Sequence, residues 1–237
     1  MFVRRHFFYR ALSSNKFKNR HKIQTAMKNY SFQSGKFQLH TSSREIKDLL
    51  IAWVLVSIAF AIVRSSESNL SVGGFFSQKF FVLIIISAVT VGLGFLLHEL
   101  AHKIVAQRYH CWAEFRADIT MLALAVLMSF LGFVFIAPGA VMIYGNITKK
   151  QSGIISIAGP LTNIVIALVF LPLLFIDASA LWKEVILSGY IINAWLALFN
   201  MIPVWNFDGS KIFRWSKTAY FATVIAAALL VFIFFVR

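Results

Sequence analysis

Two histidines and a glutamate lie close together in an apolar part of the chain. His98 and His102 are four residues apart, so on a helix they project from one face with Glu99 beside them. At this spacing two imidazoles can bind one Zn²⁺ ion while the carboxylate stays free to act on a bound water. Residues 80–97 are almost wholly apolar, so we expect the motif inside a helix long enough to cross a membrane.

A catalytic zinc ion takes three protein ligands and leaves one position for water, so the motif needs a third ligand from elsewhere. Asp208 is the best candidate, because it follows a helix end broken by Pro203 and precedes Gly209, which permits a sharp turn. An ordinary Asp-Gly turn would also account for these residues. Three weaker candidates lie in the polar segment after the motif: His110, Glu114 and Asp118.

Two non-catalytic roles for the motif fit the chain less well. A structural zinc site usually closes all four positions with Cys and His, but Cys111 is the single cysteine, which also excludes a disulfide within the chain. A buried ionic cluster without metal would leave Glu99 without a partner in an apolar helix. A catalytic metal, one Zn²⁺ per chain, is therefore the interpretation that we favour.

The composition indicates an integral membrane protein. Of the 237 residues 59% are hydrophobic and 14% are charged, and the mean hydropathy is +0.76. A soluble domain of this size has too little interior for so much apolar surface. The sequence predicts an all-α membrane protein, a polytopic helical bundle of about five to six transmembrane helices. Spans are expected near residues 48–63, 80–105, 154–176, 185–201 and 219–236.

The positive charge is distributed as in a membrane protein rather than a nucleic-acid-binding one. The formal net charge is +14, and eleven of the 23 Lys and Arg residues precede residue 48. Most of the others flank apolar runs, which is the pattern of anchoring against anionic lipid. We therefore expect membrane lipid and no nucleic acid among the partners, and a cytoplasmic N-terminus.

Residues 119–148 could cross the membrane fully, or they could dip into it and return, turning near Pro138-Gly139. With a full crossing, five basic residues would lie outside: Lys149, Lys150, Lys211, Arg214 and Lys217. With a re-entrant segment, β-hairpin-like in form, 19 Lys and Arg lie inside and four outside, in agreement with the positive-inside rule. The re-entrant topology also brings Asp208 to the membrane depth of His98 and His102.

The chain is expected to comprise a basic N-terminal extension, residues 1–44, and one membrane domain, residues 45–237. The extension contains no acidic residue and interleaves Phe and Tyr with Arg and Lys. A poorly ordered cytoplasmic tail, an organellar transit peptide and a segment that binds the membrane surface all fit this composition.

Three separated motifs occur in apolar segments, in this order: His98-Glu99-Leu100-Ala101-His102, then Gly159-Pro160-Leu161-Thr162-Asn163, then Asn200-Met201-Ile202-Pro203 leading to Asp208-Gly209. Together they resemble the site-2 protease family of intramembrane zinc metalloproteases, in particular its compact archaeal and bacterial members. The likeness covers about residues 45–220, and the chain has no inserted PDZ domain.

The resemblance implies a zinc metalloendopeptidase that hydrolyses peptide bonds in or near the transmembrane helix of single-span membrane proteins, in the cell membrane of a prokaryote. It implies that Glu99 is the general base. It implies zinc ligation by His98, His102 and Asp208. It implies substrate contacts by Asn163, Asn200, Pro138 and Gly139.

Two alternatives stay open. Asn163 could instead be a polar residue that packs between helices and bonds to a neighbouring carbonyl. The whole chain could be a metal-binding membrane transporter or channel, since intramembrane His and Glu also mark ion pathways. A transporter would place acidic residues or His along several spans, whereas this sequence has one such cluster.

Overall fold

The computed structural model describes residues 39–67, 77–134, 138–204 and 206–236. The described residues belong to one compact unit, Leu39–Arg237, and most of them are helical. The predicted N-terminal extension, residues 1–44, lies outside the described residues except for its last few.

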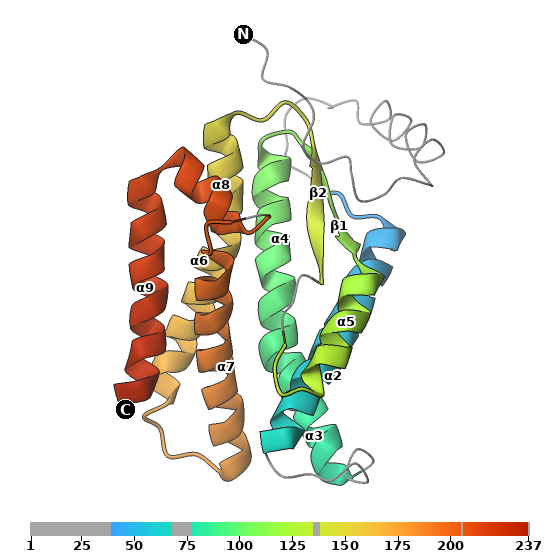
Figure 1. Cartoon of the computed structure of the whole chain (residues 1–237), viewed down its shortest axis with the longest axis vertical. Helices are drawn as coiled ribbons and strands as arrows, with labels where there is room; N and C mark the ends of the chain where they lie inside the picture. The colour runs from blue at the N-terminus through green and yellow to red at the C-terminus, as the bar shows by residue number, and fades with distance from the viewer. Residues whose placement is uncertain (1–38, 68–76, 135–137, 205, 237) are drawn as a thin grey trace. The chain divides into compact units, whose positions relative to one another are not determined.

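The first described helix, α2, spans Ser43–Glu67 (Figure 1). Its N-terminus is capped by Ser42, whose Oγ accepts a hydrogen bond of 3.2 Å from the backbone N–H of Glu45. The apolar residues that follow make this helix long enough to cross a membrane.

The helix that carries the histidine motif is built in three parts. α3 (Gln78–Ser87), a π-helical segment (Ala88–Gly92) and α4 (Leu93–Arg108) follow one another without a break. Ser77 caps the start of α3 by accepting a hydrogen bond from the backbone N–H of Phe80. In the π-helical segment, the carbonyl of Ala88 accepts a hydrogen bond of 3.0 Å from the indole of Trp53 in α2. Such π-turns recur near functional sites.

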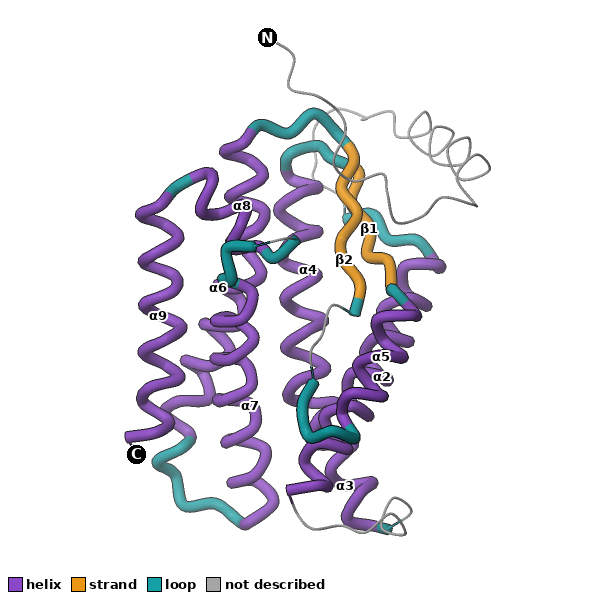
Figure 2. Tube along the Cα trace, in the orientation of Figure 1, coloured by secondary structure: helices purple, strands orange, loops and turns teal. Residues whose placement is uncertain are grey.

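A two-stranded antiparallel sheet lies beside α4 (Figure 2). β1 (Trp112–Ala117) pairs with β2 (Gly139–Tyr144), and between them α5 (Ile119–Ser129) packs against α2. The chain leaves the sheet at the end of β1 and returns to the same point, because Ala117 pairs with Gly139. The 11 residues of α5 measure about 17 Å, too little to cross a hydrocarbon core of about 30 Å. The segment between β1 and β2 therefore leaves the sheet and returns to it without a full crossing of the membrane.

Two details of this region differ from the sequence-based expectation. Pro138-Gly139 is not the tip of a turn: Pro138 is buried, its carbonyl accepts a hydrogen bond of 3.0 Å from the N–H of Asp118, and Gly139 opens β2. The partner of β2 is β1, in a segment that we expected to be a polar loop. Residues 113 and 115 of that segment are buried, so the strand exists because of packing and of pairing with a distant segment.

The C-terminal part is a group of helices that pack side by side (Figure 1). It comprises α6 (Lys149–Leu173), α7 (Ala180–Asn200) and α9 (Lys217–Val236), with the short α8 (Asp208–Trp215) between α7 and α9. Thr148 and Gln151 form a capping box at the start of α6. Tyr190 ties α7 to α9 through a hydrogen bond of 2.5 Å from its hydroxyl to the carbonyl of Leu230.

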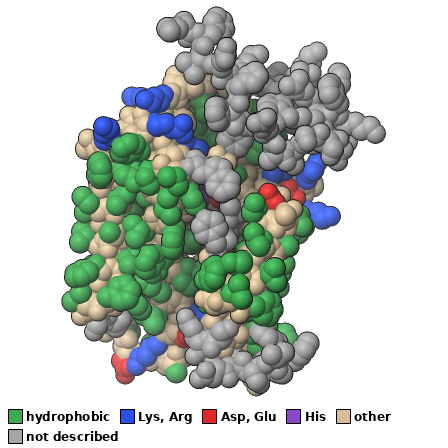
Figure 3. All heavy atoms as spheres, in the orientation of Figure 1, with side chains coloured by type: hydrophobic (Ala, Val, Ile, Leu, Met, Phe, Trp, Pro, Cys, Tyr) green, Lys and Arg blue, Asp and Glu red, His purple; other side chains and the backbone are tan. Residues whose placement is uncertain are grey.

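Four of the described helical segments are long and apolar enough to cross a membrane: Ser43–Ser65, Gln78–Arg108, Lys149–Leu173 and Lys217–Val236. This count is lower than the expected five to six. α7 has 21 residues but contains Lys183, Glu184 and Asn193, so it does not reach the same apolar character. Apolar side chains cover much of the face in Figure 3. These features are those of an integral, multi-pass membrane protein.

Candidate metal centre

Three side chains from two helices converge on one point. The Nε2 atoms of His98 and His102, both in α4, lie 3.0 Å apart. Asp208, the first residue of α8, places Oδ2 3.0 Å from Nε2 of His102 and 3.4 Å from Nε2 of His98. All three residues are buried, and they form the one group of three or more His, Cys, Asp or Glu residues with ion-sharing geometry in the described part of the chain.

The distances between these atoms fit a tetrahedral zinc site. With bonds of about 2.0–2.1 Å to nitrogen and oxygen, two ligand atoms of a tetrahedral site lie about 3.3 Å apart. The three observed separations are 3.0, 3.0 and 3.4 Å. Three protein ligands leave a fourth position for water, which is the pattern of catalytic rather than structural zinc.

Hydrogen bonds on the far side of each imidazole leave Nε2 free to bind a metal. Nδ1 of His102 lies 2.8 Å from the carbonyl oxygen of Ile155, which can only accept, so Nδ1 carries the proton. Nδ1 of His98 lies 2.5 Å from Oδ1 of Asn163. The two Nε2 lone pairs and the Asp208 carboxylate therefore face one another, an arrangement that suits a shared metal ion.

Helix α6 contributes no ligand but comes very close to the site. Gly159 in this helix lies against both imidazoles, and a Cβ at this position would fall on the Nε2 atoms of His98 and His102. Glycine at position 159 therefore allows the helix to close one side of the metal centre.

A tight turn brings Asp208 to the depth of the histidines. α7 ends at Asn200, whose side-chain amide donates a hydrogen bond of 2.8 Å to the carbonyl of Leu196. After the turn, Gly209 packs against the backbone of Met201, where any Cβ would collide. Asp208 and the histidine pair thus lie side by side in the fold.

A cation lies beside the Asp208 carboxylate. Lys211 Nζ lies 3.5 Å from Oδ1, the oxygen that the histidines do not contact. One oxygen of the carboxylate thus faces the metal position and the other faces a cation.

Glu99 stands beside the three candidate ligands and is not one of them. The backbone N–H of Val141 in β2 hydrogen-bonds to its carboxylate. Glu99 is partly exposed, whereas the three candidate ligands are buried. A carboxylate in this position can exchange a proton with a water at the fourth coordination position.

The two outer edges of the sheet face different surroundings. On β1, the N–H of Phe115 donates to Glu45 (2.9 Å) and the carbonyl of Ala113 accepts from Gln107 (3.0 Å). These backbone groups point away from β2, so their directly opposite partners, Val141 and Ile143, point away from β1. Side chains of α2 and α4 therefore cover the outer edge of β1, while the outer edge of β2 faces Glu99.

The three weaker ligand candidates lie outside the metal group. Glu114 is in β1 and forms an ion pair with Arg116. Asp118 caps α5 by accepting a hydrogen bond of 3.1 Å from the N–H of Met121. His110 lies in the turn after α4, with a φ of 61°.

The four residues predicted to contact substrate lie in different surroundings. Asn163 is buried, and its amide is engaged with protein groups. Asn200 is partly exposed at the end of α7, and Pro138 is buried. Gly139 opens β2, where a Cβ would collide with the carbonyl of Arg116. Their contacts with a substrate stay predictions.

Two residues that shape the site were not predicted from the sequence. Val141 contributes its backbone rather than its side chain, so no residue type could have revealed it. Asn193 is fully buried in α7 and bonds to Asn163. The available signal was an amide in the middle of an apolar segment, which is costly in a membrane unless it is bonded.

Comparison with known proteins shows the family of the chain. No protein-family model and no solved structure matches it. The putative zinc metalloprotease MJ0611 of Methanocaldococcus jannaschii is 40% identical over 178 residues, which are 74% of this chain and 86% of that protein. The zinc metalloprotease MJ0392 of the same organism is 27% identical over 187 residues, 78% of this chain and 45% of that protein. The chain therefore belongs to the family of the putative zinc metalloprotease MJ0611.

Proposed function

We propose that this protein is an intramembrane zinc metalloprotease of the site-2 type, which hydrolyses peptide bonds in or near the membrane helix of single-span proteins. The observation that carries the proposal is the meeting of Asp208 with His98 and His102 beside Glu99, where the histidines and Glu99 lie in a helical segment, Gln78–Arg108, that is long enough to cross a membrane. Similarity to two archaeal zinc metalloproteases supports the hydrolytic chemistry.

Different residues of the chain have different roles in the reaction. His98, His102 and Asp208 would hold Zn²⁺, which when bound polarises a carbonyl and makes water a stronger nucleophile. Glu99 accepts the proton of the attacking water and later delivers it to the leaving amine. The N–H of Val141 orients the Glu99 carboxylate during these transfers.

The outer edge of β2 is the place where an unwound substrate segment would bind. A helix hides its carbonyls in hydrogen bonds, so a membrane helix must open locally before water can attack it. Val141 and Ile143 direct backbone groups outward on the side of Glu99. An extended segment could pair with these groups by strand addition, with its scissile bond beside the metal position.

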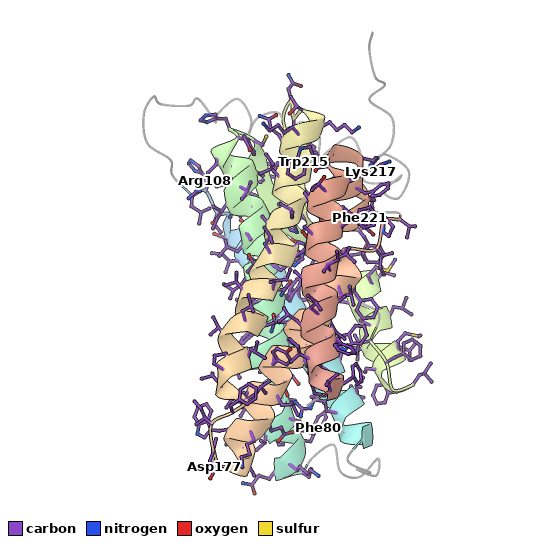
Figure 4. All side chains as sticks on the ribbon, turned by 90° about the vertical axis from the view of Figure 1, so that its left-hand side faces the viewer. Phe80, Arg108, Asp177, Trp215, Lys217 and Phe221 are labelled. Carbon is purple, nitrogen blue, oxygen red and sulfur yellow. The ribbon has the colours of Figure 1, made fainter. Side chains whose placement is uncertain are left out.

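The orientation of the protein in the membrane is inferred from the distribution of its positive charge. Basic residues at the ends of α6, α8 and α9 lie at the end of the bundle where α4 finishes (Figures 3 and 4). With the positive-inside rule, this end and the N-terminus are cytoplasmic, and anionic lipid contacts the basic residues.

An ion-transport function is the weaker alternative. Transport would require titratable groups spaced along several spans. In the described residues, one group of His, Cys, Asp and Glu has the geometry to share an ion. A single site with three ligands and a free carboxylate suits hydrolysis better.

Replacing Glu99 tests the proposal. Glu99→Gln keeps the shape of the side chain but cannot accept a proton, so we expect cleavage of a single-span reporter to fall by at least about 1,000-fold while zinc stays bound. The measurement combines reporter cleavage in proteoliposomes with zinc content by mass spectrometry.

The conservative substitution Leu100→Ile, at the exposed neighbouring residue of α4, serves as the matched control and should leave both quantities unchanged. Reporter cleavage by Glu99→Gln at the wild-type rate would remove Glu99 as the base and, with it, this mechanism.

A further inference from the structure

Asn193 lies in the middle of α7, fully buried and outside the three motifs of the family resemblance. Its Oδ1 accepts a hydrogen bond of 2.9 Å from Nδ2 of Asn163 in α6. Its own Nδ2 donates a hydrogen bond of 2.8 Å to the carbonyl of Gly189. A buried Asn between membrane helices ordinarily stabilises helix packing. The direction of these bonds indicates a more specific role.

The bonds determine how both amides are oriented. The Gly189 carbonyl can only accept, so the NH₂ group of Asn193 faces it and Oδ1 faces Asn163. Asn163 therefore directs its NH₂ group to Asn193 and to the carbonyl of Gly94, 3.2 Å away. This leaves its Oδ1 facing Nδ1 of His98 at 2.5 Å. Nδ1 must then carry the proton, and Nε2 of His98 presents its lone pair to the metal position.

Helix α4 leaves room for this arrangement. Gly94 lies one turn before His98, and a Cβ on Gly94 would collide with the side chain of Asn193. The absence of a side chain at position 94 thus lets α7 approach α4 closely. The π-helical segment ends two residues earlier, at Gly92.

The two histidines obtain the same tautomer in different ways. For His102, the acceptor at Nδ1 is a backbone carbonyl, that of Ile155, which cannot rotate. For His98, the acceptor is a side-chain amide, which could turn its NH₂ group towards the imidazole instead. Two acceptors for the NH₂ group of Asn163 oppose that rotation: the carbonyl of Gly94 at 3.2 Å and Oδ1 of Asn193 at 2.9 Å, the shorter of the two bonds.

We propose that Asn193 and Asn163 form an amide relay that positions His98 for zinc, which makes Asn193 a positioning residue of the metal centre although it contacts no ligand. The relay rests on the proposed zinc site. Groups that orient a metal-ligating histidine typically change metal affinity by about 10- to 100-fold when they are replaced. The relay adds one more residue, Asn193 in α7, to the groups that orient His98.

Zinc affinity of the full-length protein in detergent tests the relay. Asn193→Leu is nearly isosteric and removes both polar ends, so we expect the Kd for Zn²⁺ to rise about tenfold, and Asn163→Leu to raise it by as much or more. Competition with a chromogenic chelator measures both. The visible spectrum of the Co²⁺-loaded Asn193→Leu protein should also differ from that of the wild type, because the ligand field at His98 changes.

Two variants separate orientation of His98 from helix packing. Tyr190→Phe removes another buried interhelical hydrogen bond from α7, the one to Leu230, and should lower thermal stability while zinc affinity stays unchanged. Asn193→Asp keeps an oxygen facing Asn163 and should hold zinc within about threefold of the wild type.

A folded Asn193→Leu protein with wild-type zinc affinity would overturn the relay and leave Asn193 a packing residue. If Asn193→Leu does not fold, Asn193→Ser, whose side chain is too short to contact Asn163, is measured in its place. Failure of the wild-type protein to bind one Zn²⁺ ion would instead contradict the proposed function, so the two failures are distinguishable.

Discussion

Gly159 lies against both imidazoles, and a Cβ at this position would fall on their Nε2 atoms. Gly159→Ala should therefore displace the side chains of His98 and His102 from the metal position. We expect the affinity for Zn²⁺ to fall by about 100-fold, the upper end of the range for changes around a ligand. Metal content after dialysis against a weak chelator measures the loss.

Gly132→Ala is the control for this residue-scale prediction. Gly132 has a φ of +85°, which disfavours a side chain, and an added Cβ would meet no atom within 4 Å, so the substitution strains the backbone without touching a candidate ligand. This variant should lose stability and retain zinc. Equal zinc retention in both variants would mean that α6 does not limit the space around the imidazoles.

At the scale of elements, the sheet is held against the motif helix by a buried ion pair. Lys103 Nζ lies 2.6 Å from Oε2 of Glu45, and Oε1 of the same carboxylate accepts the N–H of Phe115. Both charged side chains are almost completely buried. Removing one partner of such a pair typically destabilises a protein by about 3–5 kcal/mol. α2, α4 and β1 are thereby joined, which positions β2 beside Glu99.

The outer edge of β2 gives the element-scale prediction. Val141→Pro removes the N–H that meets Glu99, and because this N–H points away from β1 the pairing of the two strands should persist. A hydrogen bond to a charged group contributes about 1.5–3 kcal/mol, so kcat/KM for a single-span reporter should fall by about 10- to 100-fold with zinc retained. Reporter cleavage and metal content measure the two effects.

Val141→Ala retains the N–H and should cleave the reporter at close to the wild-type rate. If Val141→Pro and Val141→Ala proved equally active while both held zinc, the backbone of β2 would have no part in catalysis. Thermal unfolding of both variants shows whether proline has disturbed the fold.

At the scale of the whole molecule, the basic residues at the end of α4 and the start of α9 distinguish one end of the helical bundle from the other. Arg108, Trp215 and Lys217 lie at one end and Phe80 and Asp177 at the other (Figure 4). In a protein with Cys111→Ala, a cysteine at Lys150 should react with a membrane-impermeant maleimide only after the cells are permeabilised. A cysteine at Asp177, which is highly exposed, should react in intact cells.

Labelling at both positions in permeabilised cells controls for access to the reagent. Reaction of the cysteine at position 150 in intact cells, with none at position 177, would reverse the proposed orientation and place the N-terminus outside.

Much of the site could be predicted because its chemistry is local. His98 and His102 fall on one helical face by spacing alone, and the surrounding residues are apolar enough to indicate a membrane helix. Asp208 could be predicted only with the help of charge counting and of Gly209, since nothing local separates a ligand from an Asp-Gly turn. β1 was missed because its six residues become a strand through pairing with a segment more than twenty residues away.

Composition and the period of a single helix are enough to predict the membrane class, the histidine pair and the carboxylate of Glu99 between them. The three-dimensional arrangement was needed to show which acid joins the histidines, which strand edge faces Glu99, and that Asn193 reaches His98 through Asn163. Each of these depends on contacts between segments far apart in the chain. Such contacts are determined by the packing of helices against one another, which no local pattern of residues encodes.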